Sequence, residues 1–206
     1  MRTRVKVCGI TRTEDAQAAA RAGADAIGLV FYPPSPRFLS VERARAIRDA
    51  LPPFVQTVAL FVNADAAQVA QVIGQVHPSM LQFHGEETPA FCGQFGLPYV
   101  KACRVGAGVD LLEYLRPFSA AAGWLLDAHV EEYGGVGASF DWALVPERLE
   151  RPLVLSGGLT PDNVGAAVRR IRPWAVDVSS GVESAKGIKD AARMASFIAE
   201  VRNADA

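Results

Sequence analysis

The sequence predicts an α/β protein in which eight parallel strands and their helices close into a single (β/α)8 barrel over residues 1–206. Short apolar runs rich in β-branched residues alternate along the whole chain with segments of helical period. These runs recur about every 24 residues, the length of one strand, one helix and two short loops. Parallel pairing follows, because each return to the sheet passes through a helix.

The predicted strands are short apolar segments bounded by polar or turn-forming residues. They are residues 5–8, 26–30, 57–62, 80–83, 99–102, 124–127, 153–156 and 175–179. Eight such units can close on themselves, and closure leaves no exposed strand edge. An open doubly wound sheet is the alternative, but the first strand is not followed by the GxGxxG motif typical of that fold.

Apolar stripes predict helices between the strands. Residues 65–76 place Val69, Val72, Ile73 and Val76 on one helical face, and residues 41–51 show the same spacing. A last helix is predicted around the apolar residues Met194, Phe197, Ile198 and Val201. Helix starts are expected where a threonine precedes a proline or an acidic residue, at Thr13, Thr88 and Thr160.

Composition excludes several classes of partner and site. Formal net charge is -1 and there is no Lys/Arg stripe, so we expect no nucleic-acid partner. No apolar run approaches the ~18 residues of a membrane span, and the N-terminus does not resemble a signal peptide. The three cysteines, Cys8, Cys92 and Cys103, are widely spaced, which favours reduced thiols in a cytoplasmic protein. The histidines are scattered as well, so no metal site is predicted.

Two glycine-bearing loops follow the last two predicted strands. Gly157-Gly158 follows the seventh strand, and Ser180-Gly181 follows the eighth. Active sites of such barrels lie at the C-terminal ends of the strands, where these two loops commonly bind phosphate. Glycine lets the backbone turn its N–H groups toward an anion, and Val182-Glu183 is expected to open a short helix there. Tight βα turns are the alternative reading, but two adjacent loops of this kind favour phosphate binding.

Three further side chains at or after predicted strand ends could take part in catalysis or binding. Cys8 ends the first strand and is either a packing residue or a base or nucleophile. Asp127 ends the sixth strand and is either a loop-fixing carboxylate or a general acid. Arg37 follows the second strand in a proline-rich loop and can hold a carboxylate at two points, although a solvated loop arginine is the simpler reading.

Two charged residues lie inside predicted strands. Lys6 shares its strand face with Cys8, and Asp177 lies within the eighth strand. Closure makes the first and eighth strands neighbours, so we expect these opposite charges to pair inside the barrel, within about 6 Å of each other.

The chain is similar to the phosphoribosylanthranilate isomerases of tryptophan biosynthesis. The matching stretches run almost from end to end of the sequence. They are VKVCGIT (5–11), GLVFYPPSPRFLS (28–40), LQFHG (81–85), LLDA (125–128), GGVGASFDW (134–142), LSGGLTPDNV (155–164), and VDVSSGVE with GIKD (176–190).

The resemblance implies a single TIM barrel that needs no cofactor and catalyses an Amadori rearrangement of a phosphosugar, N-(5-phosphoribosyl)anthranilate. It implies Cys8 as general base, Asp127 as general acid and Arg37 as the residue that holds the anthranilate carboxylate. Gly158, Ser180 and Gly181 fall in the phosphate loops of the family, and Gly157 precedes them. Gln82 and His84 lie at the fourth strand end, in substrate contact or behind it. A monomer and a homodimer are both compatible with the sequence.

Two positions depart from the family pattern. Val136 stands where the family usually has Thr, which removes a hydroxyl from the sixth loop. Lys186-Gly187 stands where Pro-Gly is usual, and we expect this change to affect only a surface loop.

Three rival functions are open. The histidine-pathway isomerase of the same reaction type would want a carboxylate at the Cys8 position and a second phosphate loop. A Schiff-base aldolase would need a lysine, for which Lys101 is a candidate. A non-catalytic phosphate-binding barrel would bind the substrate without converting it.

Overall fold

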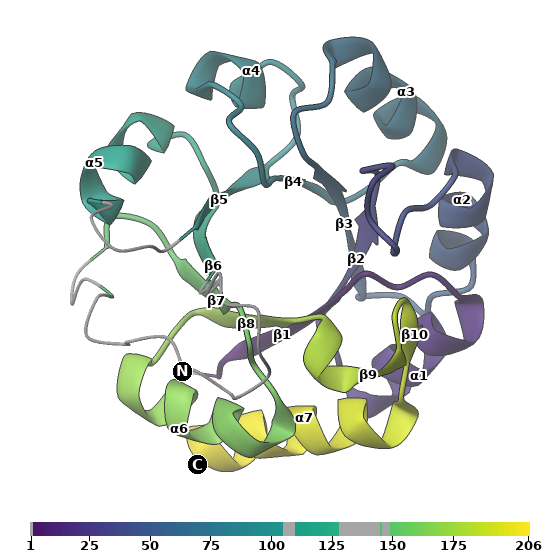
Figure 1. Cartoon of the computed structure of the whole chain (residues 1–206), viewed down its shortest axis with the longest axis vertical. Coiled ribbons are helices and arrows are strands. Elements are labelled where there is room, and N and C mark those ends of the chain that lie inside the picture. Colours follow the sequence, from purple (N-terminus) through teal and green to yellow (C-terminus); the bar gives the residue numbers. More distant parts are fainter. Residues whose placement is uncertain (1, 105–109, 128–144, 146–148) are drawn as a thin grey trace.

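Eight parallel strands form a closed barrel in the order β1 to β8, and β8 pairs back with β1 (Figure 1). The computed structural model describes residues 2–104, 110–127, 145 and 149–206. The strands are β1 (Arg4–Cys8), β2 (Ala26–Val30), β3 (Gln56–Phe61), β4 (Met80–Phe83), β5 (Tyr99–Arg104), β6 (Gly123–Asp127), β7 (Leu153–Ser156) and β8 (Ala175–Val178). The predicted barrel is therefore confirmed.

Helices surround the barrel as an outer ring (Figure 1). They are α1 (Thr13–Ala22), α2 (Val41–Asp49), α3 (Ala66–Val76), α4 (Pro89–Gly93), α5 (Leu111–Leu115) with the 3-10 helix η1 (Arg116–Phe118), α6 (Pro161–Ile171) and α7 (Ala191–Asp205). Another 3-10 helix, η3 (Ser180–Val182), leads into a small hairpin of β9 (Glu183–Ala185) and β10 (Ile188–Lys189).

Side-chain caps stand at the starts of α3, α4 and α6, whereas α1 begins at Thr13 after Arg12 and has no side-chain cap. Asp65 accepts a hydrogen bond from the Gln68 amide, so α3 begins one residue after the predicted start. Thr160 and Asn163 form a reciprocal capping box at α6, with Pro161 in the first turn. These caps satisfy backbone N–H groups that have no partner within the helix.

The hydrophobic core has an outer layer and an inner layer because strand side chains alternate between the two faces of the barrel. Phe31, Phe61 and Phe83 belong to the layer between the strands and the helices, where their rings stack in sequence. Cys8 belongs to the inner layer, where it packs with Val30 and Leu60. Polar side chains on the inner face are therefore directed toward the barrel axis.

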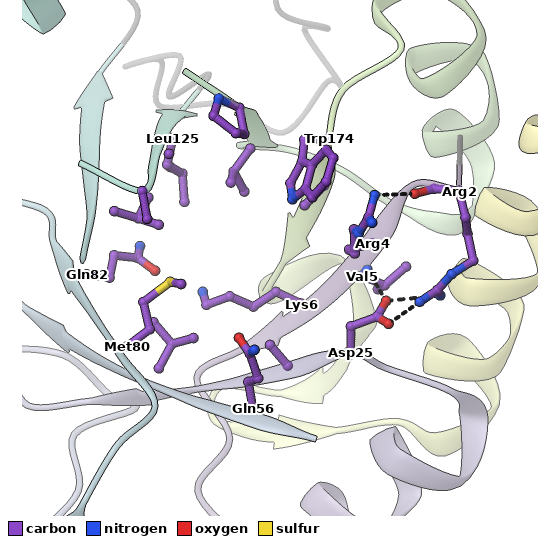
Figure 2. A pocket seen from close by; sticks show the side chains of 18 of the residues that line it. Arg2, Arg4, Val5, Lys6, Asp25, Gln56, Met80, Gln82, Leu125 and Trp174 are labelled. Carbon is purple, nitrogen blue, oxygen red and sulfur yellow. Dashed lines mark hydrogen bonds and ion pairs between the residues drawn. The ribbon is translucent and has the colours of Figure 1, made fainter. Parts of the chain in front are cut away.

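Lys6 and Asp177 are paired inside the barrel, as predicted. They are direct partners in the β1–β8 register, and Lys6 Nζ donates to Asp177 Oδ2 at 2.7 Å. Both residues are buried. Figure 2 shows the Lys6 side chain reaching into the barrel interior, toward the side that carries Met80 and Gln82. A cavity of about 420 Å³ opens below it, at the N-terminal ends of the strands.

Lys101 faces the helical layer and not the barrel axis. It shares strand parity with Tyr99 and Cys103, which belong to the outer core layer. Its ammonium contacts the Gly85 carbonyl and lies 3.0 Å from the Glu87 carboxylate, and both side chains are almost completely buried. Lys101 is thus a structural partner of Glu87. A Schiff-base lysine would have to face the barrel interior, and Lys101 faces the helices.

Among the residues that the structure describes, none of the helices has the length and apolar character of a membrane-spanning helix.

The buried Lys101–Glu87 pair is expected to contribute to the free energy of unfolding. Changing Glu87→Gln leaves the buried ammonium without its counter-charge, so the free energy of unfolding should fall by about 3 kcal/mol. Asp49→Asn is the matched control, because the Arg48–Asp49 pair is solvent-exposed on its acidic side and should change stability by less than about 1 kcal/mol. Urea denaturation followed by circular dichroism measures both, and similar small effects would contradict the assignment.

Candidate active site

One cavity of about 460 Å³ lies at the C-terminal ends of the barrel strands. Its lining brings together side chains and turns from the C-terminal ends of all eight strands. Of the nine residues predicted for the site, eight line it: Cys8, Arg37, Gln82, His84, Asp127, Gly157, Gly158 and Ser180. Gly181 lies next to Ser180 but is not part of the lining. Residues far apart in sequence thus meet in one pocket, as expected for the catalytic face of such a barrel.

Cys8 ends β1 and presents its thiol on the inner face of the barrel, where it is 6% exposed. The chain can turn away directly after it because Gly9 adopts a positive φ of 72°. A Cβ at Gly9 would lie 2.3 Å from Arg37 Cδ, so this glycine also leaves room for the Arg37 side chain. Burial raises the pKa of the Cys8 thiol, while the positive charge of Lys6 opposes that rise.

Asp127 is held by a chain of hydrogen bonds that starts on β4. Gln82 Nε2 donates to His84 Nδ1 at 3.1 Å, so the imidazole carries its proton on Nε2. His84 Nε2 in turn lies 3.0 Å from Asp127 Oδ2 and donates to it. Gln82 is 1% exposed, so its side chain is shielded from solvent. Gln82 and His84 therefore orient the carboxyl group of Asp127 in the pocket.

The loops after β7 and β8 pack directly against each other. Gly157 and Gly158 adopt positive φ values of 88° and 61°, a conformation that favours glycine. A Cβ at Gly181 would lie 1.9 Å from the Leu159 carbonyl oxygen, so only glycine permits the observed approach of the two loops. The short helix expected at Val182-Glu183 is instead the 3-10 turn η3, and Glu183 begins β9.

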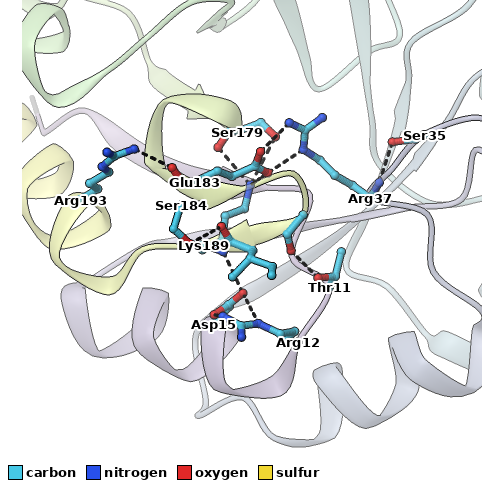
Figure 3. A network of polar contacts seen from close by, with 12 residues as sticks. Thr11, Arg12, Asp15, Ser35, Arg37, Ser179, Glu183, Ser184, Lys189 and Arg193 are labelled. Carbon is cyan, nitrogen blue, oxygen red and sulfur yellow. Dashed lines mark hydrogen bonds and ion pairs between the residues drawn. The ribbon is translucent and has the colours of Figure 1, made fainter.

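Arg37 is fixed by a network of charges that the β9–β10 hairpin supplies (Figure 3). Its Nε and Nη2 atoms donate to the two oxygens of Glu183, each at 2.7 Å. Lys189 Nζ lies 2.8 Å from Glu183 Oε1 and also donates to the Ser179 carbonyl. Hydrogen bonding to Glu183 raises the pKa of Arg37, so the guanidinium stays charged.

The roles of Glu183 and Lys189 were not predicted from the sequence. Both lie in the stretch after the eighth strand, but Glu183 lies 146 positions from Arg37, so only the fold brings the pair together. The departure from the family pattern at residues 186–187 lies in Lys186, since Gly187 is common to both patterns. Lys186 is exposed, whereas Gly187 is buried and accepts a hydrogen bond from Thr11, so the hairpin tip packs against the loop after β1. Val136 lies outside the described residues.

A comparison with protein families identifies one match that spans almost the whole sequence. The family model for N-(5'-phosphoribosyl)anthranilate (PRA) isomerase matches residues 5–200. A curated relative, the N-(5'-phosphoribosyl)anthranilate isomerase of Dechloromonas aromatica, is 57% identical over 206 residues, which are 100% of this chain and 99% of the relative.

Solved structures show the same likeness in three dimensions. The phosphoribosyl anthranilate isomerase of Thermotoga maritima superimposes with a TM-score of 0.90 at 43% identity, covering 98% of this chain and 99% of its own. A second crystal structure shows a phosphoribosyl anthranilate isomerase in complex with reduced 1-(o-carboxyphenylamino)-1-deoxyribulose 5-phosphate. It has a TM-score of 0.87 and 40% identity, covering 98% of this chain and 99% of its own. The chain therefore belongs to the phosphoribosylanthranilate isomerase family.

Proposed function

We propose that this pocket converts N-(5-phospho-β-D-ribosyl)anthranilate to 1-(2-carboxyphenylamino)-1-deoxy-D-ribulose 5-phosphate, using only its own side chains. The observation that carries the proposal is that Cys8, Asp127 and Arg37 open onto one cavity with two glycine loops. A base, an acid, a carboxylate-binding group and an anion-binding turn are the four parts that this substrate and this reaction require.

The reaction begins with acid catalysis. Protonated Asp127 gives its proton to the ring oxygen of the ribose, the C1–O bond breaks, and a Schiff base forms between C1 and the anthranilate nitrogen. The thiolate of Cys8 then removes the acidified proton from C2 to give an enolamine. This intermediate gains a proton at C1 and loses its C2 hydroxyl proton, so the product is an isomer of the substrate.

Gln82 and His84 serve this step by orienting Asp127, because their hydrogen-bond chain ends on Asp127 Oδ2. A carboxyl group held at one oxygen keeps its direction when the substrate enters. We therefore assign both residues to the positioning of the acid, behind the atoms that react.

Arg37 is proposed to bind the carboxylate of the anthranilate ring. Its Nε–Nη2 edge is already bonded to Glu183, so the Nη1 end is the part that can meet a substrate carboxylate. Phosphate is proposed to bind at the turn of Gly157 and Gly158, which have positive φ values, and at Ser180; all three residues line the cavity.

Residues 1–206 are proposed to act as one catalytic domain in the cytoplasm, where the free thiols Cys8, Cys92 and Cys103 stay reduced. The assembly is proposed to be a monomer or a homodimer.

The activity itself is tested with the purified protein and phosphoribosylanthranilate. We expect the fluorescence of this compound to disappear at a rate proportional to enzyme concentration, because the rearrangement consumes it. A folded protein that binds the substrate analogue but leaves the fluorescence unchanged would support a binding protein and refute the enzyme. Turnover of the histidine-pathway substrate in place of phosphoribosylanthranilate would support that rival isomerase.

The two catalytic roles are tested by removing each proton-transfer group. Cys8→Ala and Asp127→Asn should each lower turnover by at least ~10²-fold with a smaller change in KM, since general acid–base groups typically contribute ~10²–10⁴-fold. Cys92→Ala is the matched control, because Cys92 is a buried cysteine of α4 outside the pocket and its loss should leave turnover of the folded protein unchanged. Near-normal turnover in either active-site variant would remove that residue from its role.

The carboxylate-binding role predicts a different kinetic effect. Arg37→Ala should raise KM by about tenfold or more, with a smaller change in kcat, because a charge-assisted contact to the substrate is lost. Arg43→Ala, an exposed arginine at the start of α2, should leave both constants unchanged. Steady-state kinetics decide the matter, and an unchanged KM for the Arg37 variant would exclude this contact.

A further inference from the structure

The proposed base, Cys8, must lose its thiol proton before it can act, and burial disfavours the thiolate. An ordinary thiol with a pKa of about 8.5 is mostly protonated at neutral pH, and only the thiolate can take a proton. Burial raises the pKa of Cys8 further, because the charged form loses its hydration. A cation close to the sulfur is needed to offset this cost.

Lys6 lies beside the sulfur because Gly28, on the neighbouring strand β2, has no side chain. Cys8 and Gly28 are partners in the β1–β2 register. A Cβ built on Gly28 would lie 2.7 Å from Cys8 Sγ and 3.1 Å from Lys6 Nζ. Cys8 Sγ and Lys6 Nζ thus both border the space that a Gly28 side chain would fill. The sulfur and the ammonium therefore lie within the roughly 6 Å over which charges couple strongly.

Asp177 keeps Lys6 charged and directed. The carboxylate accepts from Lys6 Nζ at 2.7 Å, and its other oxygen, Oδ1, is buried without a hydrogen-bond partner among the described residues. Burial alone would lower the pKa of Lys6, but the negative charges of Asp177 and Cys8 raise it above the ordinary value. Lys6 therefore remains an ammonium at neutral pH.

The other charged groups near Cys8 leave room for one more negative charge. Lys6 and Asp177 lie on β1 and β8, Lys189 and Glu183 on the hairpin, and Arg37 on the loop after β2. Three cations and two carboxylates leave one positive charge, which a thiolate would balance. His84 and Asp127 are hydrogen-bonded to each other elsewhere in the same cavity.

Lys189 is the other cation that could stabilise the sulfur, and its own contacts make it the weaker candidate. Its ammonium is bonded to Glu183 and to both oxygens of Ser179. Burial lowers the pKa of Lys189 below its ordinary value, in contrast to Lys6. Of the two lysines, Lys6 also has the larger effect on the Cys8 pKa.

We propose that Lys6, directed by Asp177 and given space by Gly28, stabilises the thiolate form of Cys8 and so allows the sulfur to act as a base. The thiol proton is transferred to water and Lys6 keeps its own protons. The thiolate sulfur then accepts the C2 proton of the substrate. Lys6 is a positioning residue in this scheme. The inference rests on the proposed role of Cys8, but it concerns the ionisation of the thiol, which can be measured without turnover.

The test is the pH profile of Cys8 alkylation by iodoacetamide in the folded protein, read by peptide mass spectrometry. The midpoint of this profile reports the apparent pKa of the thiol. Lys6→Met should move the midpoint upward by about one pH unit or more, because the nearest cation is lost. The double variant Lys6→Met/Asp177→Asn removes the uncompensated buried carboxylate and secures folding, and it should show a smaller upward shift.

The matched control is Lys101→Met/Glu87→Gln, which neutralises the buried pair on the outer face of the barrel. Its Cys8 midpoint should equal that of the wild type. A folded double variant at Lys6 and Asp177 whose midpoint stays at or below the wild-type value would overturn the proposal. If the wild-type protein failed to convert the substrate while its Cys8 midpoint still shifted as expected in the Lys6 variants, the proposed function would be refuted and this inference would stand.

Discussion

The ion pair of Lys6 and Asp177 is the interaction on which the rest of the site depends. It crosses the β1–β8 seam, where the barrel closes, with the two residues as direct register partners. Two charges in a buried interior are costly unless they are paired at short distance, so the seam has to close in this register. The same closure sets Cys8 above the pair and beside the glycine loops of β7 and β8.

A second charge network holds the other side of the pocket. The β9–β10 hairpin supplies Glu183 and Lys189, and the Lys189 backbone amide donates to Asp15 on α1. Glu183 fixes two nitrogens of Arg37, so the guanidinium has its direction before substrate arrives. Preorganisation of this kind reduces the entropy cost of binding, because the side chain need not be immobilised by the ligand.

Much of the fold and of the site was predictable because both follow from short-range patterns. Apolar runs and helical stripes located all eight strands to within two residues. Cys8, Asp127 and the Gly157-Gly158 turn could be assigned to one site because the carboxyl ends of parallel strands meet at one face. The pairing of Lys6 with Asp177 was predictable for the same reason, since closure alone makes β1 and β8 neighbours.

The barrel, its catalytic face and the residue types available there follow from the amino-acid sequence, because strand spacing and strand parity are local properties of the chain. Which charges meet depends on the folding of distant segments against each other. Arg37 and Glu183 lie 146 positions apart, and the loop contact made possible by Gly181 depends on the position of the Leu159 carbonyl. Contacts of this kind follow from packing between distant segments, and no local pattern in the sequence encodes their distances.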